Sequence, residues 1–490
     1  MVTTVLKLRM EALAQHLREA QDPSIWLGSL QLSPMPDKNL WFKAVEAIQR
    51  EADSLLADLE ADLESPTDDA EKLWKDYFRI YERSHEIFRE SLELLGGLAL
   101  RDRIHEEYAC RFADELISEC AEFVGKPTSF AIPATEDALS STLRRVARIS
   151  FPDWHLWALP LVAHEYGQVV VRETASFDRF VDELASQASK PVLDENYNDL
   201  KSALPAIANS GLRRIAHDQI AQAELEPRTA ADKMESLALM LRADEADIGE
   251  RAQKAARSIK ASLDSATNQA RVLVADVFAT YTAGPAYACA ALMLRLNPNS
   301  PPVPGRPTDE ERAETILAVL AQMDAATPNP PPPFAKVGQS LQSSWTLLLD
   351  GSGRHDPPGQ VHLDAAHALS MIKKRMLRDQ AEFTKADWIE AESLGNAWWI
   401  KINAGQKPDV SANVLPNIDH LRLRDVLNAA WQCRLLVIEQ AQPEDASNAT
   451  DKVTDAARQL CDRILASRQA LLAPAEFGGR APRPGEASAG

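Results

Sequence analysis

Apolar side chains recur at every third or fourth position along most of this chain of 490 residues, and this spacing restricts it to a mainly helical fold. Residues 37–64, 69–96 and 98–124 place Leu, Ile, Val, Phe or Trp at positions i, i+3, i+4 and i+7, as in a helix with one buried face. The same spacing predicts a helix over 135–148. Strand signals are few: 125–133 indicates a linker with room for one short extended piece, and short pieces such as 344–349 compete with the helical pattern. We therefore predict a mainly α, multi-lobed helical protein.

Proline and glycine indicate where the helices should break. The helical pattern from 230 to 294 is longer than an ordinary globular helix, so we expect breaks near Asp244 and at Gly284-Pro285. Pro160 falls inside another helical pattern, where it should kink or restart the helix.

Two proline-rich connectors, at 297–307 and 327–334, separate helical regions, because such runs favour extended polyproline segments without hydrogen bonds. Between them, Thr308 and the acidic residues after it predict a capped helix. The resulting division is an N-terminal helical region (1–125), a helical core (126–325), a proline- and glycine-rich linker (326–360), a C-terminal helical lobe (361–472) and a disordered tail (473–490).

The chain is acidic, with 72 Asp and Glu against 53 Lys and Arg and a formal net charge of −19. This balance disfavours nucleic acids and anionic membranes as partners, because both are negatively charged. The longest apolar run, 283–294, is shorter than the ~20 residues that cross a bilayer. We therefore expect no nucleic-acid partner and no membrane insertion.

The five cysteines are odd in number and form no C-x-x-C motif. Cys110 and Cys120 lie on one helical pattern about 15 Å apart, which is too far for a disulfide. The set predicts reduced, buried thiols and a cytoplasmic location.

One pair of residues belongs to a pattern with known chemistry. His164 and Glu165 lie on a predicted helix, and Gln168 stands four residues after the histidine. In the motif H-E-x-x-H, two histidines at i and i+4 share a helical face and bind one Zn²⁺, and the Glu deprotonates the metal-bound water. Gln168 takes the place of the second histidine.

A downstream segment extends this likeness. Val272 to Asp276 is similar to the helix E-x-x-x-D of the glutamate-type zincins, in which the Glu is the third zinc ligand and the Asp orients the first histidine. Over roughly 150–310 the chain thus resembles a degenerate gluzincin, and the resemblance implies a zincin-like core within 126–325. The site residues that it implies are Glu165 as the catalytic residue and His164, Gln168 and Asp276 around a metal.

Two of the three zinc-ligand positions hold unsuitable residues, because a Gln amide is a weak neutral ligand and Val cannot coordinate. The first hypothesis is therefore a catalytically degenerate metallopeptidase-like protein that acts as an interaction or regulatory scaffold, with a protein partner and no cofactor. The alternative is an active zinc-dependent peptidase, with Glu165 as base and Asp276 or Glu173 recruited as a ligand. A third hypothesis is a structural helical interaction protein in which His164-Glu165 is accidental. The sequence leaves open whether the chain is an enzyme, and its oligomeric state.

Overall fold

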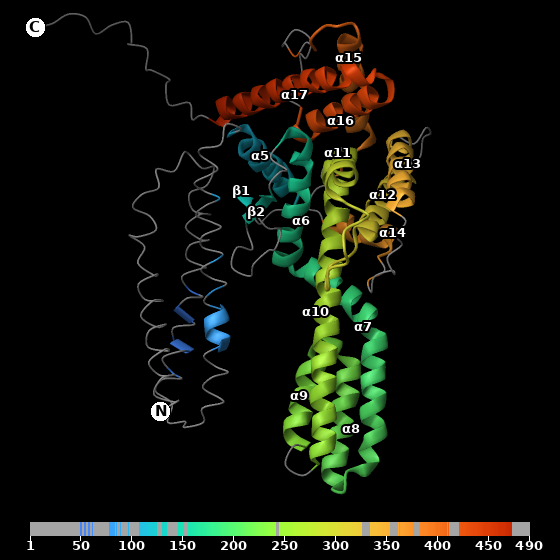
Figure 1. Cartoon of the computed structure of the whole chain (residues 1–490). Coiled ribbons are helices and arrows are strands. Elements are labelled where there is room, and N and C mark those ends of the chain that lie inside the picture. Colours follow the sequence, from blue (N-terminus) through green and yellow to red (C-terminus); the bar gives the residue numbers. More distant parts are fainter. Residues whose placement is uncertain are drawn as a thin grey trace, which may run out of the picture. The chain divides into compact units, whose positions relative to one another are not determined.

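Helices make up almost all of the part of the chain that the computed structural model describes (Figure 1), which confirms the mainly α prediction. The described residues are 107–124, 130–134, 146–150, 155–241, 245–325, 334–352, 361, 363–375, 382–408, 410 and 421–472, with short helical pieces between 50 and 97. Most of the predicted N-terminal region and the whole predicted tail, 473–490, lie outside them. No described helix has both the length and the apolar character needed to cross a bilayer.

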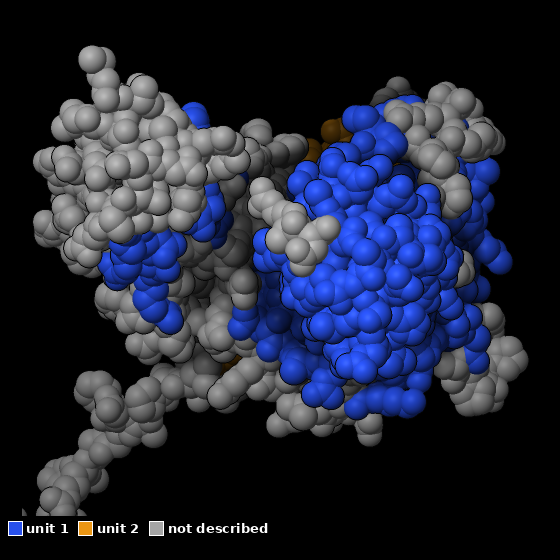
Figure 2. Space-filling model, turned by 90° about the horizontal axis from the view of Figure 1, so that it is seen from below, with its two compact units in different colours: residues 1–385 blue, residues 386–490 orange. Residues whose placement is uncertain are grey.

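The chain divides into two compact units, 1–385 and 386–490 (Figure 2). Helix α14 (Ala365–Arg375) packs on α10 (Ala246–Ala283) and α12 (Asp309–Ala325). It therefore belongs to the first unit, although the sequence places it in a C-terminal lobe beginning at 361.

Four helices of the first unit lie side by side as a bundle (Figure 1). They are α7 (Ala175–Ala203), α8 (Ser210–Leu225), α9 (Ala230–Leu241) and the first half of α10, with the turns η2 (Leu204–Ala206) and η3 (Pro227–Thr229) between them. Their core is apolar and includes Ile220, Met234, Leu237 and Ile259, none of which is exposed to solvent. Asn209 caps α8, because its side chain accepts hydrogen bonds from the amides of Gly211 and Leu212.

The second half of α10 forms the centre of the other part of this unit. Every residue from Leu273 to Ala283 is buried. Helix α6 (Val162–Glu173) packs on this half, and α12 and α14 also contact α10. A helix that is buried on all sides must be surrounded by other elements, which is why Asp276 on α10 lies inside the protein.

The predicted helix breaks are confirmed. Helix α9 ends at Leu241 and α10 begins at Ala246. Gly284, at φ 67°, ends α10 and precedes Pro285, the first residue of α11 (Pro285–Ala290), which continues into the π-helical turn η4 (Ala291–Arg295). Pro160 lies in the 3₁₀ turn η1 (Leu156–Leu161), and the α-helical hydrogen bonding of α6 starts only after it.

A parallel pair of strands corrects the helix predicted over 135–148. Strand β1 (Phe130–Ala134) pairs with β2 (Val146–Ser150), so residues 146–148 are extended rather than helical. The amide of Ala131 also donates to the Asp114 carboxylate on α5 (Glu107–Val124). The segment 135–148 has too few apolar residues to distinguish the helical period of 3.6 from the strand period of 2. Pairing with the neighbouring strand therefore determines the conformation of residues 146–148.

Helix α13 (Ala335–Ser352) occupies a range that the sequence analysis divided between linker and strand. Phe334, Val337, Leu341 and Trp345 are all buried, at the spacing of a single helical face. The prolines before this segment end at 333, so they do not interrupt its hydrogen bonds.

The second unit contains α15 (Lys385–Asn403), α16 (Leu423–Gln440) and α17 (Pro443–Leu472). Trp388, Trp398 and Trp431 are buried in it, as expected of anchors of a helical core. Gly395 lets α15 approach α16, because a Cβ atom there would lie 2.6 Å from the carbonyl oxygen of Ala429.

Candidate functional site

Helices α6 and α10 bring the two candidate segments together. His164 projects from α6 and Asp276 from α10, and the His164 Nδ1 atom lies 2.8 Å from Asp276 Oδ1. Gly167, one turn after His164, permits this approach: a Cβ there would lie 2.9 Å from the ring of Phe278 and 3.2 Å from the carbonyl oxygen of Ala275.

Asp276 is fully buried within a set of donors. The hydroxyl of Tyr287 donates to Oδ1 over 2.5 Å, and Arg312 donates through Nε to Oδ2 (3.0 Å) and through Nη2 to Oδ1 (2.9 Å). The two-pronged contact fits the planar guanidinium, which matches a carboxylate with two parallel hydrogen bonds. The carboxylate therefore holds Tyr287, Arg312 and His164 together.

Charge keeps this carboxylate ionised. Burial by itself would raise the pKa of Asp276, but the charge of Arg312 and the contact with the His164 ring outweigh it and hold the pKa below its ordinary value. Burial also opposes the charge on Arg312, yet Asp276 raises the pKa of that guanidinium further above its ordinary range. The pKa of Tyr287 is raised by burial and then by Asp276, so its hydroxyl remains a donor.

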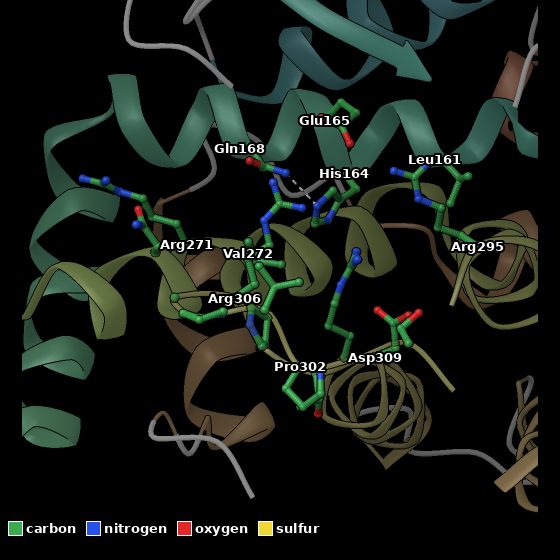
Figure 3. Close-up of a pocket in the computed structure, with 18 of the residues that line it drawn as sticks. Leu161, His164, Glu165, Gln168, Arg271, Val272, Arg295, Pro302, Arg306 and Asp309 are labelled. Atoms are coloured by element: carbon green, nitrogen blue, oxygen red, sulfur yellow. Dashed lines mark hydrogen bonds between the residues drawn. The ribbon is translucent and has the colours of Figure 1, made fainter. Parts of the chain in front are cut away.

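Gln168 contacts the other ring nitrogen of His164. The Gln168 amide Nε2 lies 2.9 Å from His164 Nε2 (Figure 3). The 2.8 Å between Nδ1 and Asp276 Oδ1 is a close contact without hydrogen-bond geometry, but an ionised Asp276 can only accept, so the neutral tautomer that suits both neighbours has its hydrogen on Nδ1 and leaves Nε2 to accept from Gln168. The lone pair that a zinc ion would need is thus engaged by an amide of the chain.

The remaining positions of the pattern do not supply ligands. Val272 lines the same pocket as Gln168 and has no coordinating atom (Figure 3). Asp276 contacts Nδ1 of His164 rather than Nε2, and it is not part of the pocket lining. Glu173, at the end of α6, is not part of the lining either. Among the described residues no group of three or more His, Cys, Asp or Glu side chains is placed to hold a metal. Glu165 is half-buried and does line the pocket.

The pocket in front of His164 has a volume of about 530 Å³. Helices α6 and α10 form one side, and the proline-rich segment 300–307 forms the other. The proline pattern of this segment predicts a connector and gives no sign of its place in the pocket wall. Arg312 was not predicted as a site residue either, because its position shortly after the capped start of α12 gives no local sign of its contact with Asp276.

No protein family, no curated protein and no solved structure matches this chain.

Proposed function

We propose that this chain is a catalytically degenerate metallopeptidase-like protein, in which the former zinc site has become a binding site without hydrolytic activity. One observation carries the proposal: the Gln168 amide engages His164 Nε2, the atom that would bind zinc, while Val272 stands where a carboxylate ligand is needed. The expected role is that of an interaction or regulatory scaffold.

The meeting of His164 with Asp276 supports this proposal over an accidental His-Glu pair. In a zincin the carboxylate orients the histidine through its second ring nitrogen, and Asp276 Oδ1 lies 2.8 Å from the corresponding atom, Nδ1 of His164. A chance dipeptide on a core helix has no reason to have a buried carboxylate at this position.

We further propose that the protein acts in the cytoplasm with a protein partner. Five buried free thiols suit a reducing compartment, and the net charge of −19 favours partners other than nucleic acid.

The first experiment measures zinc in the purified full-length protein after incubation with the metal and dialysis, by plasma mass spectrometry. We expect far less than one zinc per chain. About one zinc per chain that is lost in His164→Ala would overturn the proposal and favour the active peptidase.

The second experiment restores the missing ligands. Gln168→His with Val272→Glu should bind zinc in the full-length protein, because residue 168 already reaches His164 Nε2. The matched control, Gln168→His with Val272→Ile, keeps an apolar side chain at 272 and should bind zinc much more weakly. If the folded double variant, checked by circular dichroism, binds no more zinc than this control, the zincin-like geometry is wrong.

A further inference from the structure

The pocket in front of His164 is lined by a concentration of arginine. Five arginines from five different elements line it, no lysine does, and the only carboxylates in the lining are Glu165 and Asp309. The five are Arg172 on α6, Arg271 on α10, Arg295 on η4, Arg306 on the proline-rich segment and Arg312 on α12. In a chain with a net charge of −19, these cations are gathered at one place.

The proline-rich segment presents Arg306 in a defined turn. The amide of Arg306 donates to the carbonyl oxygen of Val303 over 3.0 Å, with Pro304 and Gly305 at the two central positions and Gly305 at φ 77°. Proline followed by a glycine of positive φ is the signature of a type II turn. The backbone of Arg306 is therefore held in place before any ligand binds, so ordering the loop adds little to the entropic cost of binding.

Further contacts hold this segment against the rest of the unit. Asp309 accepts a hydrogen bond from the amide of Asn297 over 2.8 Å, at the beginning of the segment. The α-carbon of Ser265 on α10 lies 3.8 Å from the position of a Cβ at Gly305. Asp309 thus braces the loop, and its carboxylate is already engaged by the backbone.

The arginines differ in how they are held. Arg312 contacts the buried Asp276, and Arg271 lies 3.5 Å from Asp178, a carboxylate that Arg228 shares. The Arg306 side chain is exposed and forms no ion pair with the described residues. Figure 3 shows Arg271, Arg295 and Arg306 around the space into which His164 and Gln168 point.

We propose that this pocket binds a small molecule that carries two or more phosphate groups; the inference rests on the proposed function, since it names the ligand class of the same non-catalytic site. Arginine presents a planar fork of donors that matches phosphate oxygens in pairs, and although Arg312 already uses two donors on Asp276, the lining offers arginines from five elements to a ligand with several anionic groups. A pocket of about 530 Å³ has the size of a small-molecule site rather than of a protein docking surface. Five arginines against two carboxylates leave an excess of three positive charges in the lining, and one phosphate with about two negative charges does not offset them, whereas two do.

The test measures binding of pyrophosphate, ATP and inositol hexakisphosphate to the full-length protein by isothermal titration calorimetry, at about 0.1 M and about 0.3 M salt. The protein is first dialysed against a chelator and its zinc content measured. We expect saturable binding of at least one of the three at one site per chain, weaker at the higher salt. Tightest binding of pyrophosphate would indicate recognition of the phosphates alone, tightest binding of ATP recognition of a nucleoside, and tightest binding of inositol hexakisphosphate recognition of a polyol.

Two substitutions and a matched control locate the site. Arg306→Gln and Arg295→Gln should each weaken binding about tenfold, the usual effect of losing a hydrogen bond to a charged group. Arg257→Gln removes an exposed arginine of α10 that is outside the pocket lining, and it should leave affinity unchanged.

Several results would overturn the inference. They are the absence of saturable binding of all three phosphates, unchanged affinity in both pocket variants, binding of citrate as tight as that of pyrophosphate, or binding of an acidic peptide without binding of phosphates. Zinc bound through His164 would instead refute the proposed function, so the two failures are separate.

Discussion

His164 Nδ1 lies 2.8 Å from Asp276 Oδ1, and this contact joins two helices that are far apart in the sequence. It places an imidazole, which needs an acceptor when buried, against a carboxylate that Arg312 keeps ionised. This geometry depends on how closely α6 and α10 approach each other at Gly167.

Gly167→Ala should destabilise the protein by about 1–3 kcal/mol, because the new methyl group would meet the ring of Phe278 at 2.9 Å in a packed interior. The matched control is Gly338→Ala on α13, where an added Cβ meets nothing within 4 Å. That substitution should raise stability by up to ~1 kcal/mol, because alanine favours a helix more than glycine does. Urea unfolding followed by circular dichroism checks both, and equal effects at the two glycines would show that the approach of α6 to α10 is not tight.

Asp276→Asn should lower the free energy of unfolding by about 2–4 kcal/mol near neutral pH, because it leaves the mostly buried Arg312 charge without its partner. Asp264→Asn, at an exposed position of the same helix, is the control and should have little effect. Chemical denaturation of the three proteins gives the comparison.

The same substitution has a predicted pH dependence. The pKa of Asp276 is lowered in the folded protein, so the folded state binds fewer protons there than the unfolded state does. The stability that this carboxylate contributes is therefore complete above its ordinary pKa of about 4 and declines as the pH falls below it. The difference in the free energy of unfolding between wild type and Asp276→Asn should therefore shrink below about pH 4. A difference that grows on acidification would contradict the lowered pKa of Asp276.

Asp425 in the second unit should behave in the opposite way. Burial raises the pKa of its carboxyl to about 6, although the neighbouring Arg424 acts to lower it. The folded state then binds more protons than the unfolded state between about pH 4 and pH 6, so stability falls as the pH rises through this range, by up to about 3 kcal/mol.

Asp425→Asn should remove this slope and stabilise the unit at neutral pH, since an amide oxygen can still accept from the backbone amide of Arg422. The measurement is the protection of the α16 amides from hydrogen exchange in wild type and in Asp425→Asn. Comparing the two proteins at the same pH removes the pH dependence of the intrinsic exchange rate. Asp455→Asn, at an exposed position of α17, should keep the wild-type slope. Greater protection of wild type than of Asp425→Asn at pH 7 would refute the assignment.

All five cysteines are buried free thiols, and burial raises the pKa of Cys433 to about 12. A thiol reagent at neutral pH should therefore react slowly with the native protein, because the thiolate is the reactive form. In denaturant without reductant, all five thiols should react at once. Rapid reaction of the native protein, or fewer than five thiols after denaturation, would contradict this prediction.

The sequence by itself determined the features that depend on neighbouring residues. The helical period, the break at Gly284-Pro285 and the capped start of α12 at Thr308 are local, because each rests on hydrogen bonds and backbone angles within a few residues. The placing of His164 and Gln168 on one helical face is local for the same reason, since i and i+4 are neighbours on any helix.

The tertiary structure alone decided which surfaces face one another. Periodicity shows that a helix has a buried face but not what covers it, so the contact of Arg312 with Asp276 and the gathering of arginines around the pocket were not predictable from their own segments. The pairing of β1 with β2 depends likewise on a partner strand. These features arise from contacts between residues distant in the chain, where packing and charge pairing, rather than local propensity, determine the lowest free energy.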